Sequence, residues 1–276
     1  ATLLGTVTAN GTGAWSLTTG QLANGTHSLT ATATDLAGNV SGASGALNVT
    51  VDTVAPTTPS IVSFSPDSGT VGDGITSANV VTVTGAAEAG STVKVYDGAT
   101  LLGTVTANGT GAWSLTSGQL ANGTHSLTAT ATDLAGNVSG TSGALNVTVD
   151  TVAPTAPSIT AFTPDTGVVG DSVTSANIVT VSGAAEANSA VKVYDGATLL
   201  GTANVNSSGA WSFTTAALVS GSHSFTATAT DAAGNVSSAS AATNVTVEAA
   251  PGTPAITSVS PDTALPNDGL TNASVL

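Results

Sequence analysis

Carboxylates are the side chains in this chain with the most capacity for chemistry. Sixteen Asp and Glu residues are accompanied by two Lys or Arg residues, which gives a net charge of −14. Carboxylates gathered without cations repel one another, and a divalent ion relieves that repulsion. Calcium, which takes about six to eight oxygen ligands with loose geometry, suits such a set better than magnesium or zinc. There is no Cys, so disulfides are excluded.

The acids recur at fixed positions of a repeat. Every acid occupies one of six repeat positions, which are Asp35, Asp133 and Asp231; Asp52, Asp150 and Glu248; Asp67, Asp165 and Asp262; Asp73, Asp171 and Asp268; Glu88 and Glu186; Asp97 and Asp195. Charge that only keeps a protein soluble is free to drift among surface sites, so the pattern indicates a shared role. Recent duplication of the repeat would give the same pattern.

The repeat itself covers essentially the whole chain. The stretch "ATLLGT" begins at Ala1, Ala99 and Ala197, a period of 98 residues. "GAWSLT" at Gly13 and Gly111 returns as "GAWSFT" at Gly209. A period of this length means that one folding unit is used several times.

Within a repeat, apolar and polar residues alternate as they do in half-buried strands. In "HSLTATATD", Leu127, Ala129 and Ala131 fall on one face and the threonines on the other. The stretches "NVVTVTGAA", "STVKVYDG", "TLLGTVTA", "AWSLTS" and "ALNVTVD" have the same character, and "NGTG" and "DGAT" are typical of turns. About seven strands in roughly a hundred residues predict an all-β, immunoglobulin-like β-sandwich. Its core is expected to consist of Val, Leu, Ala and one Trp, which is Trp15, Trp113 or Trp211.

The proline-rich stretches "VDTVAPTTPS" and "VDTVAPTAPS" mark the joints between repeats. We therefore expect complete repeats at residues 56–153 and 154–249, the C-terminal part of a repeat at 1–55 and the N-terminal part of another at 250–276. The chain is then a window of a longer array. Pro56 and Pro59 restrict the backbone, so the predicted arrangement is an elongated rod of tandem sandwiches.

Because strands alternate in direction, the acidic loops gather at the two ends of each predicted sandwich. At the joint between the complete repeats, the acids expected to converge are Asp67, Asp73, Asp97 and Asp150 with Glu186 and Asp231. The sequence thus predicts calcium at the joints, with Asp150, Glu186 and Asp231 preferred as ligands. The full set of candidate ligands is Asp52, Asp67, Asp73, Glu88, Asp97, Asp133, Asp150, Asp165, Asp171, Glu186 and Asp231. The alternative is that these acids cap turns, as Asp67 would in "SPDSG".

Taken together, "DTVAPTAPS", "GAAEAGSTVKVYDGATLLGT", "GAWSLT" and "ATATDLAGNVS" resemble the bacterial Ig-like repeats of giant surface adhesins and biofilm-associated proteins. The resemblance implies a secreted or cell-surface protein, commonly exported by a type I system, whose repeats form a stalk. It also implies that calcium makes the joints rigid. The matching positions here are Asp52, Asp150, Glu88, Glu186, Asp133 and Asp231.

Other functions find little support in the sequence. A strongly acidic chain is a poor partner for nucleic acid, and no run of about 18 apolar residues is present to span a membrane. His27, His125 and His223 invite a catalytic or metal role, but we interpret them as surface or turn-packing residues. Trp in the repeats could stack on sugars, although one Trp per sandwich is more typical of a core. An enzyme is not expected.

Three functions remain open. The first is a structural stalk segment of an adhesin or biofilm matrix protein, stiffened by calcium. The second is a set of repeats that themselves bind polysaccharide or a host surface. The third is a matrix fibre in which chains assemble side by side through exposed edge strands that bear few charges. The expected partners are neighbouring repeats of the same chain and, in the third case, other copies.

Overall fold

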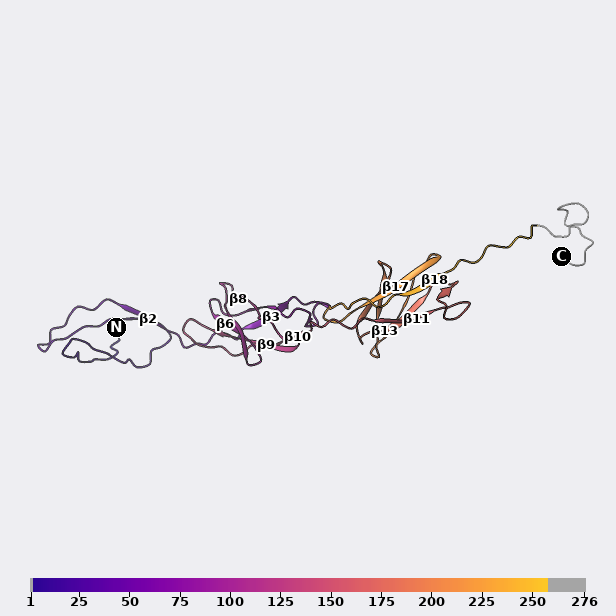
Figure 1. Ribbon diagram of the computed structural model, residues 1–276. Helices are drawn as coiled ribbons and strands as arrows, with labels where there is room; N and C mark the ends of the chain where they lie inside the picture. The colour runs from indigo at the N-terminus through magenta and orange to yellow at the C-terminus, as the bar shows by residue number, and fades with distance from the viewer. Residues whose placement is uncertain (1, 258–276) are drawn as a thin grey trace, which may run out of the picture. The chain divides into compact units, whose positions relative to one another are not determined.

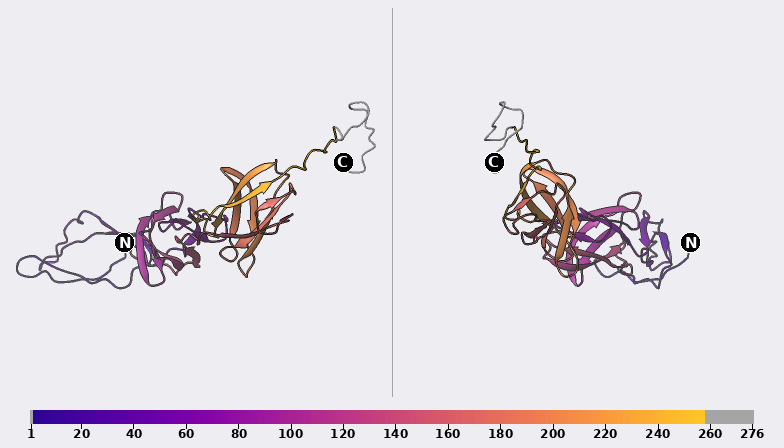
Figure 2. Two further views of the ribbon diagram at one scale, coloured as in Figure 1. Left: turned by 45° about the vertical axis from the view of Figure 1, so that its right-hand side comes forward. Right: turned by 90° about the vertical axis from the view of Figure 1, so that its right-hand side faces the viewer.

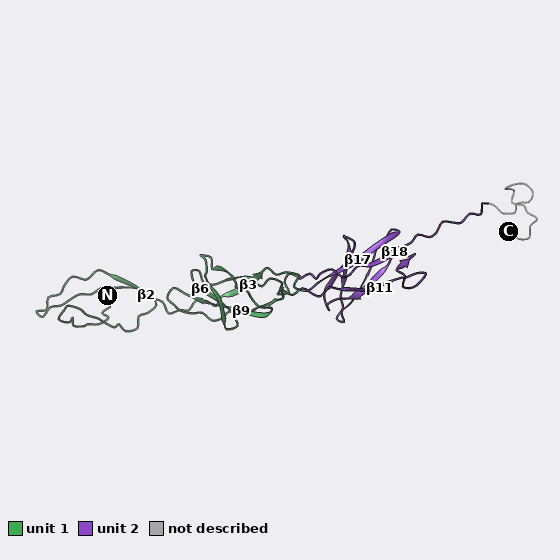
Figure 3. Cartoon of the chain, in the orientation of Figure 1, with its two compact units in different colours: residues 1–152, 232–234 green, residues 153–231, 235–276 purple. Residues whose placement is uncertain are grey.

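A computed structural model describes residues 2–257 of the chain, and the regular elements in this range are all β-strands (Figure 1). The chain divides into two compact units, one of residues 1–152 with 232–234 and the other of 153–231 with 235–276 (Figure 3). Each unit contains one complete two-sheet sandwich, which confirms the predicted fold class. The described residues contain no helix that could cross a membrane. The predicted partial repeat at 250–276 lies largely outside the described residues.

The first sandwich is built from eight strands. They are β3 (Ser60–Ser65), β4 (Ile75–Thr76), β5 (Thr82–Ala86), β6 (Thr92–Asp97), β7 (Thr100–Thr106), β8 (Ala112–Thr116), β9 (Gly123–Thr132) and β10 (Leu145–Val149). The smaller sheet has the order β3-β5-β8, and the larger has the order β4-β10-β9-β6-β7. In this sandwich β4 and β10 pair in parallel, and the other strand pairs are antiparallel. The first part of the repeat contributes β3 to the smaller sheet and β4 to the larger one.

The second sandwich repeats this topology, with sheets β11-β13-β16 and β12-β18-β17-β14-β15. Figure 2 shows two further views of the chain, in which the later strands of this sandwich are orange and yellow. Its strands are β11 (Ser158–Thr163), β12 (Val173–Thr174), β13 (Thr180–Ala184), β14 (Ala190–Asp195), β15 (Thr198–Asn204), β16 (Ala210–Thr214), β17 (Gly221–Thr230) and β18 (Thr243–Val247). The same topology in both sandwiches is what a sequence repeat predicts.

The core lies between the two sheets and consists of small aliphatic residues around one Trp. In β6 and β9 the apolar side chains turn inward, and Val93, Val95, Leu127 and Ala129 are fully buried. Trp113 of β8 is 4% exposed and packs in the same cluster. Threonines take the outward positions, because a β-branched polar residue suits the solvent face of a strand.

Serine hydroxyls complete the pairing of β9, which is longer than its neighbour β10. The backbone N–H of Ala129 donates to Ser142 Oγ at 2.9 Å, and that of Ala131 donates to Ser139 Oγ at 2.9 Å. The backbone N–H groups of the same two serines donate back to the carbonyls of Ala129 and Ala131. The turn after β9, residues 133–137, is called the F–G turn below. The segment that follows it therefore replaces a regular strand here, which leaves few buried backbone groups unpaired.

The copy of the repeat at the start of the chain is much less complete. It contributes β1 (Gly25–Leu29) and β2 (Leu47–Val51), which form a two-stranded sheet. Trp15 is 56% exposed, whereas Trp113 is 4% exposed. The prediction that Trp15 is a core residue is therefore wrong in this structure. Trp113 packs against β5, and the described residues 2–55 include no counterpart of β5.

Close packing of β3, β5 and β8 makes one glycine irreplaceable. A Cβ on Gly85 would overlap the carbonyl oxygen of Ser60 and the ring of Trp113. We predict that Gly85→Ala lowers the unfolding free energy of this sandwich by about 3 kcal/mol, the upper part of the range for overpacking. Urea unfolding followed by Trp fluorescence measures it. Gly118→Ala, where nothing lies within 4 Å of the added Cβ, is the control, and equal effects of both changes would contradict the prediction.

Candidate functional site

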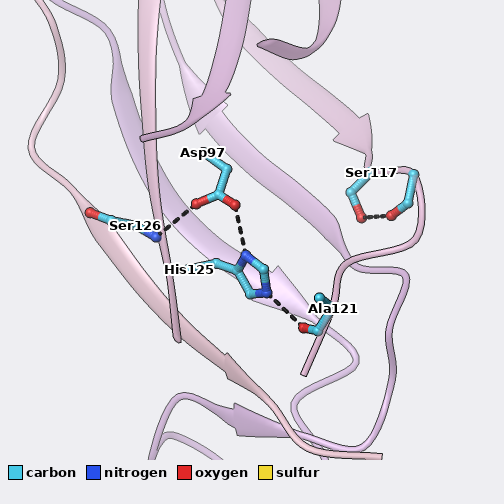
Figure 4. A network of polar contacts seen from close by, with 6 residues as sticks. Asp97, Ser117, Ala121, His125 and Ser126 are labelled. Atoms are coloured by element: carbon cyan, nitrogen blue, oxygen red, sulfur yellow. Dashed lines mark hydrogen bonds and ion pairs between the residues drawn. The ribbon is translucent and has the colours of Figure 1, made fainter. Parts of the chain in front are cut away.

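The most highly organised polar site in each complete sandwich joins an Asp to a His. In the first, the Nδ1 of His125 lies 2.7 Å from Asp97 Oδ2 and its Nε2 lies 2.8 Å from the carbonyl oxygen of Ala121 (Figure 4). Asp97 Oδ1 also accepts the backbone N–H of Ser126 at 3.1 Å. The pair thus fastens the end of β6 to the start of β9 and to the loop before it.

Both ring nitrogens of this histidine must donate. A carbonyl oxygen can only accept, so Nε2 bears a hydrogen, and an ionised carboxylate can only accept, so Nδ1 bears one too. The two bonds are therefore made together when the imidazole is protonated. Burial lowers the pKa of His125, but the hydrogen bonds to Ala121 and Asp97 and the charge of Asp97 outweigh it, so the pKa lies above the usual 6.5. Asp97 is the one charged group that acts on it among the described residues.

The second sandwich repeats the pair with more burial. The His223 Nδ1 lies 2.7 Å from Asp195 Oδ2 and its Nε2 lies 2.8 Å from the Val219 carbonyl oxygen. His223 is 6% exposed and stacks on Phe225. The bond to Asp195 is the largest influence on the pKa of His223, and the net effect again raises it.

The Asp–His pair was missed in the sequence, where the histidines were interpreted as surface or turn-packing residues. Asp97 was instead a candidate calcium ligand. One signal was present, because the two residues are 28 positions apart in both complete repeats. The pairing needs the register of β6 against β9, in which Asp97 lies opposite Leu127, and residue types alone do not give that register.

A second group of contacts surrounds the F–G turn. Asp133 Oδ1 accepts the backbone N–H of Asn137 at 2.8 Å, and Oδ2 accepts its side-chain amide at 2.8 Å. The side-chain bond is the main reason that the pKa of Asp133 is lowered. The same Asn137 amide also donates to the backbone carbonyl of Asp52 at 3.1 Å. An acid in the turn therefore orients the amide that holds the preceding linker.

The linker after Asp52 is itself ordered. Asp52 Oδ1 accepts the N–H of Val54 at 3.0 Å, which closes a turn directly ahead of the prolines. Pro56 and Pro59 are both buried. Through these two prolines the short stretch is packed against the protein.

The remaining predicted ligands lie in separate loops. Asp67 Oδ2 accepts the N–H of Gly72, and Asp73 Oδ1 accepts that of Ile75. In the second sandwich, Asp165 and Asp171 accept the N–H groups of Gly170 and Val173 in the same way. Asp150 accepts the N–H of Val152, as Asp52 accepts that of Val54. These acids cap turns, as the alternative interpretation states. Asp231 binds Asn235 as Asp133 binds Asn137.

The carboxylates of two candidate ligands, Glu88 and Glu186, do not accept the hydrogen bonds that close their own turns. For Glu88 and Glu186 the turn contact is the backbone carbonyl, which accepts from Ser91 and Ser189. Within residues 2–257, no group of three or more Asp, Glu or His residues lies close enough together to hold a metal ion. Among the predicted ligands, Asp52 and Asp133 are brought together through the amide of Asn137.

Comparison with known proteins identifies the repeats. Residues 1–53, 55–151 and 153–249 match the family model of the bacterial Ig-like domain. The chain belongs to the bacterial Ig-like domain family. The resemblance inferred from the sequence is thereby confirmed, and so is the tandem arrangement of the repeats.

Individual relatives of this bacterial Ig-like chain include an enzyme. Exoglucanase B of Cellulomonas fimi is 36% identical over 241 residues, which make up 83% of this chain and 21% of the exoglucanase. The chain thus spans about a fifth of that protein's length.

Solved structures that match the chain include modules of an enzyme and repeats of an adhesin. Fibronectin(III)-like modules of Clostridium thermocellum CbhA match with a TM-score of 0.44 and 19% identity, over 69% of this chain and 94% of theirs. A 1.5-MDa bacterial ice-binding adhesin matches with a TM-score of 0.35 and 22% identity, over 78% of this chain and 71% of that structure.

The chemistry open to these Ig-like repeats follows from the contacts. In the Asp–His pair the Nε2 of His125 is bonded to the Ala121 carbonyl, so the ring nitrogen that would activate a nucleophile is already engaged. The carboxylates instead close turns and position an amide at the linker. The sites are thus suited to holding loops in place.

The Asp–His pairs give the stability a definite pH dependence. Because the folded-state pKa of each His is raised, the added stability is fully present below about pH 6.5 and is lost as the pH rises through the folded pKa. We predict that the urea midpoint of the chain falls between pH 6 and pH 9, as measured by fluorescence. Asp97→Asn with Asp195→Asn should flatten this dependence, because an amide cannot stabilise the charged ring. A wild-type midpoint that stays constant over this range would contradict the prediction.

Proposed function

We propose that this chain is a stalk segment of a bacterial surface adhesin or secreted matrix protein, whose repeats keep other parts of that protein at a distance. The observation on which the proposal depends is the bond from the Asn137 amide to the Asp52 carbonyl, which ties a linker to the turn of the following repeat. A spacer needs joints that do not collapse. Membership of the bacterial Ig-like family and the tandem order of the repeats support the same role.

The packing around this linker supports a stiff joint. Pro56 and Pro59 are buried, and Thr58 approaches Gly140, which lies just beyond the F–G turn. Proline fixes the backbone dihedral φ, so little conformational freedom remains between Asp52 and β3. Outward-facing threonines keep the strands soluble without adding charges that would attract other molecules.

We extend the proposal to calcium at this joint, with Asp52, Glu88 and Asp133 as ligands; Asp150, Glu186 and Asp231 occupy the same repeat positions. The donor set is oxygen only, which suits calcium. The Glu88 carboxylate is not used by its own turn, and the chain has few cations to balance these acids. The fit is incomplete, because the carboxylates of Asp52 and Asp133 already accept hydrogen bonds. Calcium would reinforce a joint that the backbone contacts already define.

Titration of the whole chain tests the calcium part. We predict binding with a dissociation constant of about 10⁻⁴–10⁻³ M, the range of extracellular modules, together with a higher melting temperature in millimolar calcium. Asp133→Asn with Asp231→Asn should abolish both effects in calorimetry. Asp73→Asn with Asp171→Asn, which removes the same charge from another loop, should retain them. No heat of binding to the wild-type chain would remove calcium from the proposal and leave the spacer role untouched.

The exoglucanase relative favours one alternative, namely that the repeats bind a polysaccharide. A stalk has no need of such binding, and Trp113 and Trp211, which could stack on sugars, are buried. We therefore predict that the chain stays in the supernatant after incubation with insoluble cellulose. Retention on cellulose that free oligosaccharide reverses would replace the spacer proposal with a binding function.

A further inference from the structure

Each sandwich has four edge strands, which end the two sheets on either side. In the first sandwich they are β3 and β8 in the small sheet and β4 and β7 in the large one. An edge strand presents unpaired N–H and C=O groups, which are a template for pairing with another chain. Proteins shorten, bulge, charge or cover such edges to prevent it.

Three of the four edges are protected in this way. β4 has two residues. β3 has a register shift between Ile61 and Ser63, which leaves Val62 without a partner in β5. β7 is irregular where it meets Val95 and Tyr96 of β6, and Leu102 is skipped in the pairing. The second sandwich has the same features in β11, β12 and β15.

The fourth edge, β8, is neither shortened, bulged nor charged; its neighbour in the other sheet is β7, where Gly103 faces the Leu115 side chain. It pairs with β5 over its whole length in unbroken register, from Ala112 opposite Ala86 to Thr116 opposite Thr82. It contains neither proline nor a charged residue. Its counterpart β16 pairs with β13 in the same unbroken way. An unbulged, neutral edge therefore occurs once in each complete repeat.

The backbone groups that β8 leaves open can be named. The N–H of Ser117 donates to the Val81 carbonyl, and the N–H of Ala87 donates to the Gly111 carbonyl. In an antiparallel pair the bonded residues alternate, so the odd-numbered residues of β8 bond to β5 and the even-numbered ones face away. Ala112 uses its N–H and C=O on Asn108. The N–H and C=O groups of Ser114 and Thr116 remain on the open side.

The small sheet around this edge is electrically neutral. β3, β5 and β8 contain no ionisable residue, and neither do β11, β13 and β16. On the outer face, hydroxyl pairs join Ser63 to Thr84 and Thr82 to Thr116 at 2.9 Å. The acids lie in loops and at the end of β6. A strand can therefore approach β8 without bringing carboxylates of either chain into direct opposition.

We propose that β8 and its counterpart β16 are docking edges for the same strand of a second copy of this chain. Antiparallel pairing about a two-fold axis at Leu115 would place Ser114 opposite Thr116 of the other copy and the reverse, so every open group finds a partner. A second copy fits because its edge is neutral and equally unprotected, whereas an unrelated strand has no reason to match both features. The two small sheets would join into one.

This lateral pairing goes beyond the spacer role and needs no metal, so it is tested with a chelator present. In sedimentation equilibrium of the full chain up to roughly 1 mM, where weak pairing becomes populated, the mean mass should rise above 26.1 kDa. It should pass twice that value at high concentration, because β8 and β16 give each chain two docking edges. Added NaCl should strengthen the association, because salt screens repulsion between the acidic chains. A mass that stays at that of the monomer would overturn the proposal.

Matched variants identify the edge. Ser114→Lys with Ser212→Lys places a charge on the open edges β8 and β16 and should weaken association at least tenfold. Ser114→Pro with Ser212→Pro removes one outward N–H per edge without removing a bond to β5 or β13, and should act in the same direction. The control, Thr104→Lys with Thr202→Lys, adds the same charges to the bulged edges β7 and β15. Fluorescence of buried Trp113 and Trp211 reports whether each variant is folded. Equal weakening by the folded control would assign the contact to another surface and refute the proposal.

Discussion

Carboxylates in this chain must find their hydrogen-bond donors in nearby backbone N–H groups, because sixteen acids share two Lys or Arg residues. Asp52 and Asp73 each accept the N–H two residues later, and Asp133 accepts the one four residues later. Each acid thereby closes the loop in which it lies. Charge-assisted bonds of this kind are stronger than neutral ones, which matters in a sandwich whose core is made mainly of Val and Ala.

The same constraint keeps charge away from most of the strands. With the acids committed to turns, the small sheet has hydroxyl pairs on its solvent face, such as Thr82 with Thr116. Solubility then comes from the loops and from outward threonines. Edge protection has to come from backbone geometry, as at Val62 and Leu102, because charged residues are not available there. The distribution of sixteen acids thus determines both how the loops are held and which edges stay open.

The sequence predicted the strands well because alternation depends only on which residues face the core. Leu127, Ala129 and Ala131 were expected on one face and are fully buried. Trp15 was expected in the core by the same reasoning but is exposed, since a strand is buried only when its partner strands are present. The turn-capping role of Asp67 was foreseen as an alternative because its donor is local in sequence. The Asp97–His125 pair was not, because it joins two strands whose relative register comes from the folded sheet.

Local and long-range contacts meet at Asn137, and this explains how one short turn can govern a joint. Its amide is oriented by Asp133 and donates onward to the Asp52 carbonyl. The bond to Asn137 lowers the pKa of Asp133 below its usual 3.8, so this carboxylate stays ionised in mildly acidic solution and its contribution is lost only as the pH falls through the lowered value. The Asp–His pair behaves oppositely and weakens as the pH rises. The Asp133 contact, which orders the linker, is therefore lost at low pH, and the Asp–His contact, which holds the sandwich loops, is lost at high pH. Both contacts are intact in the mildly acidic interval between them.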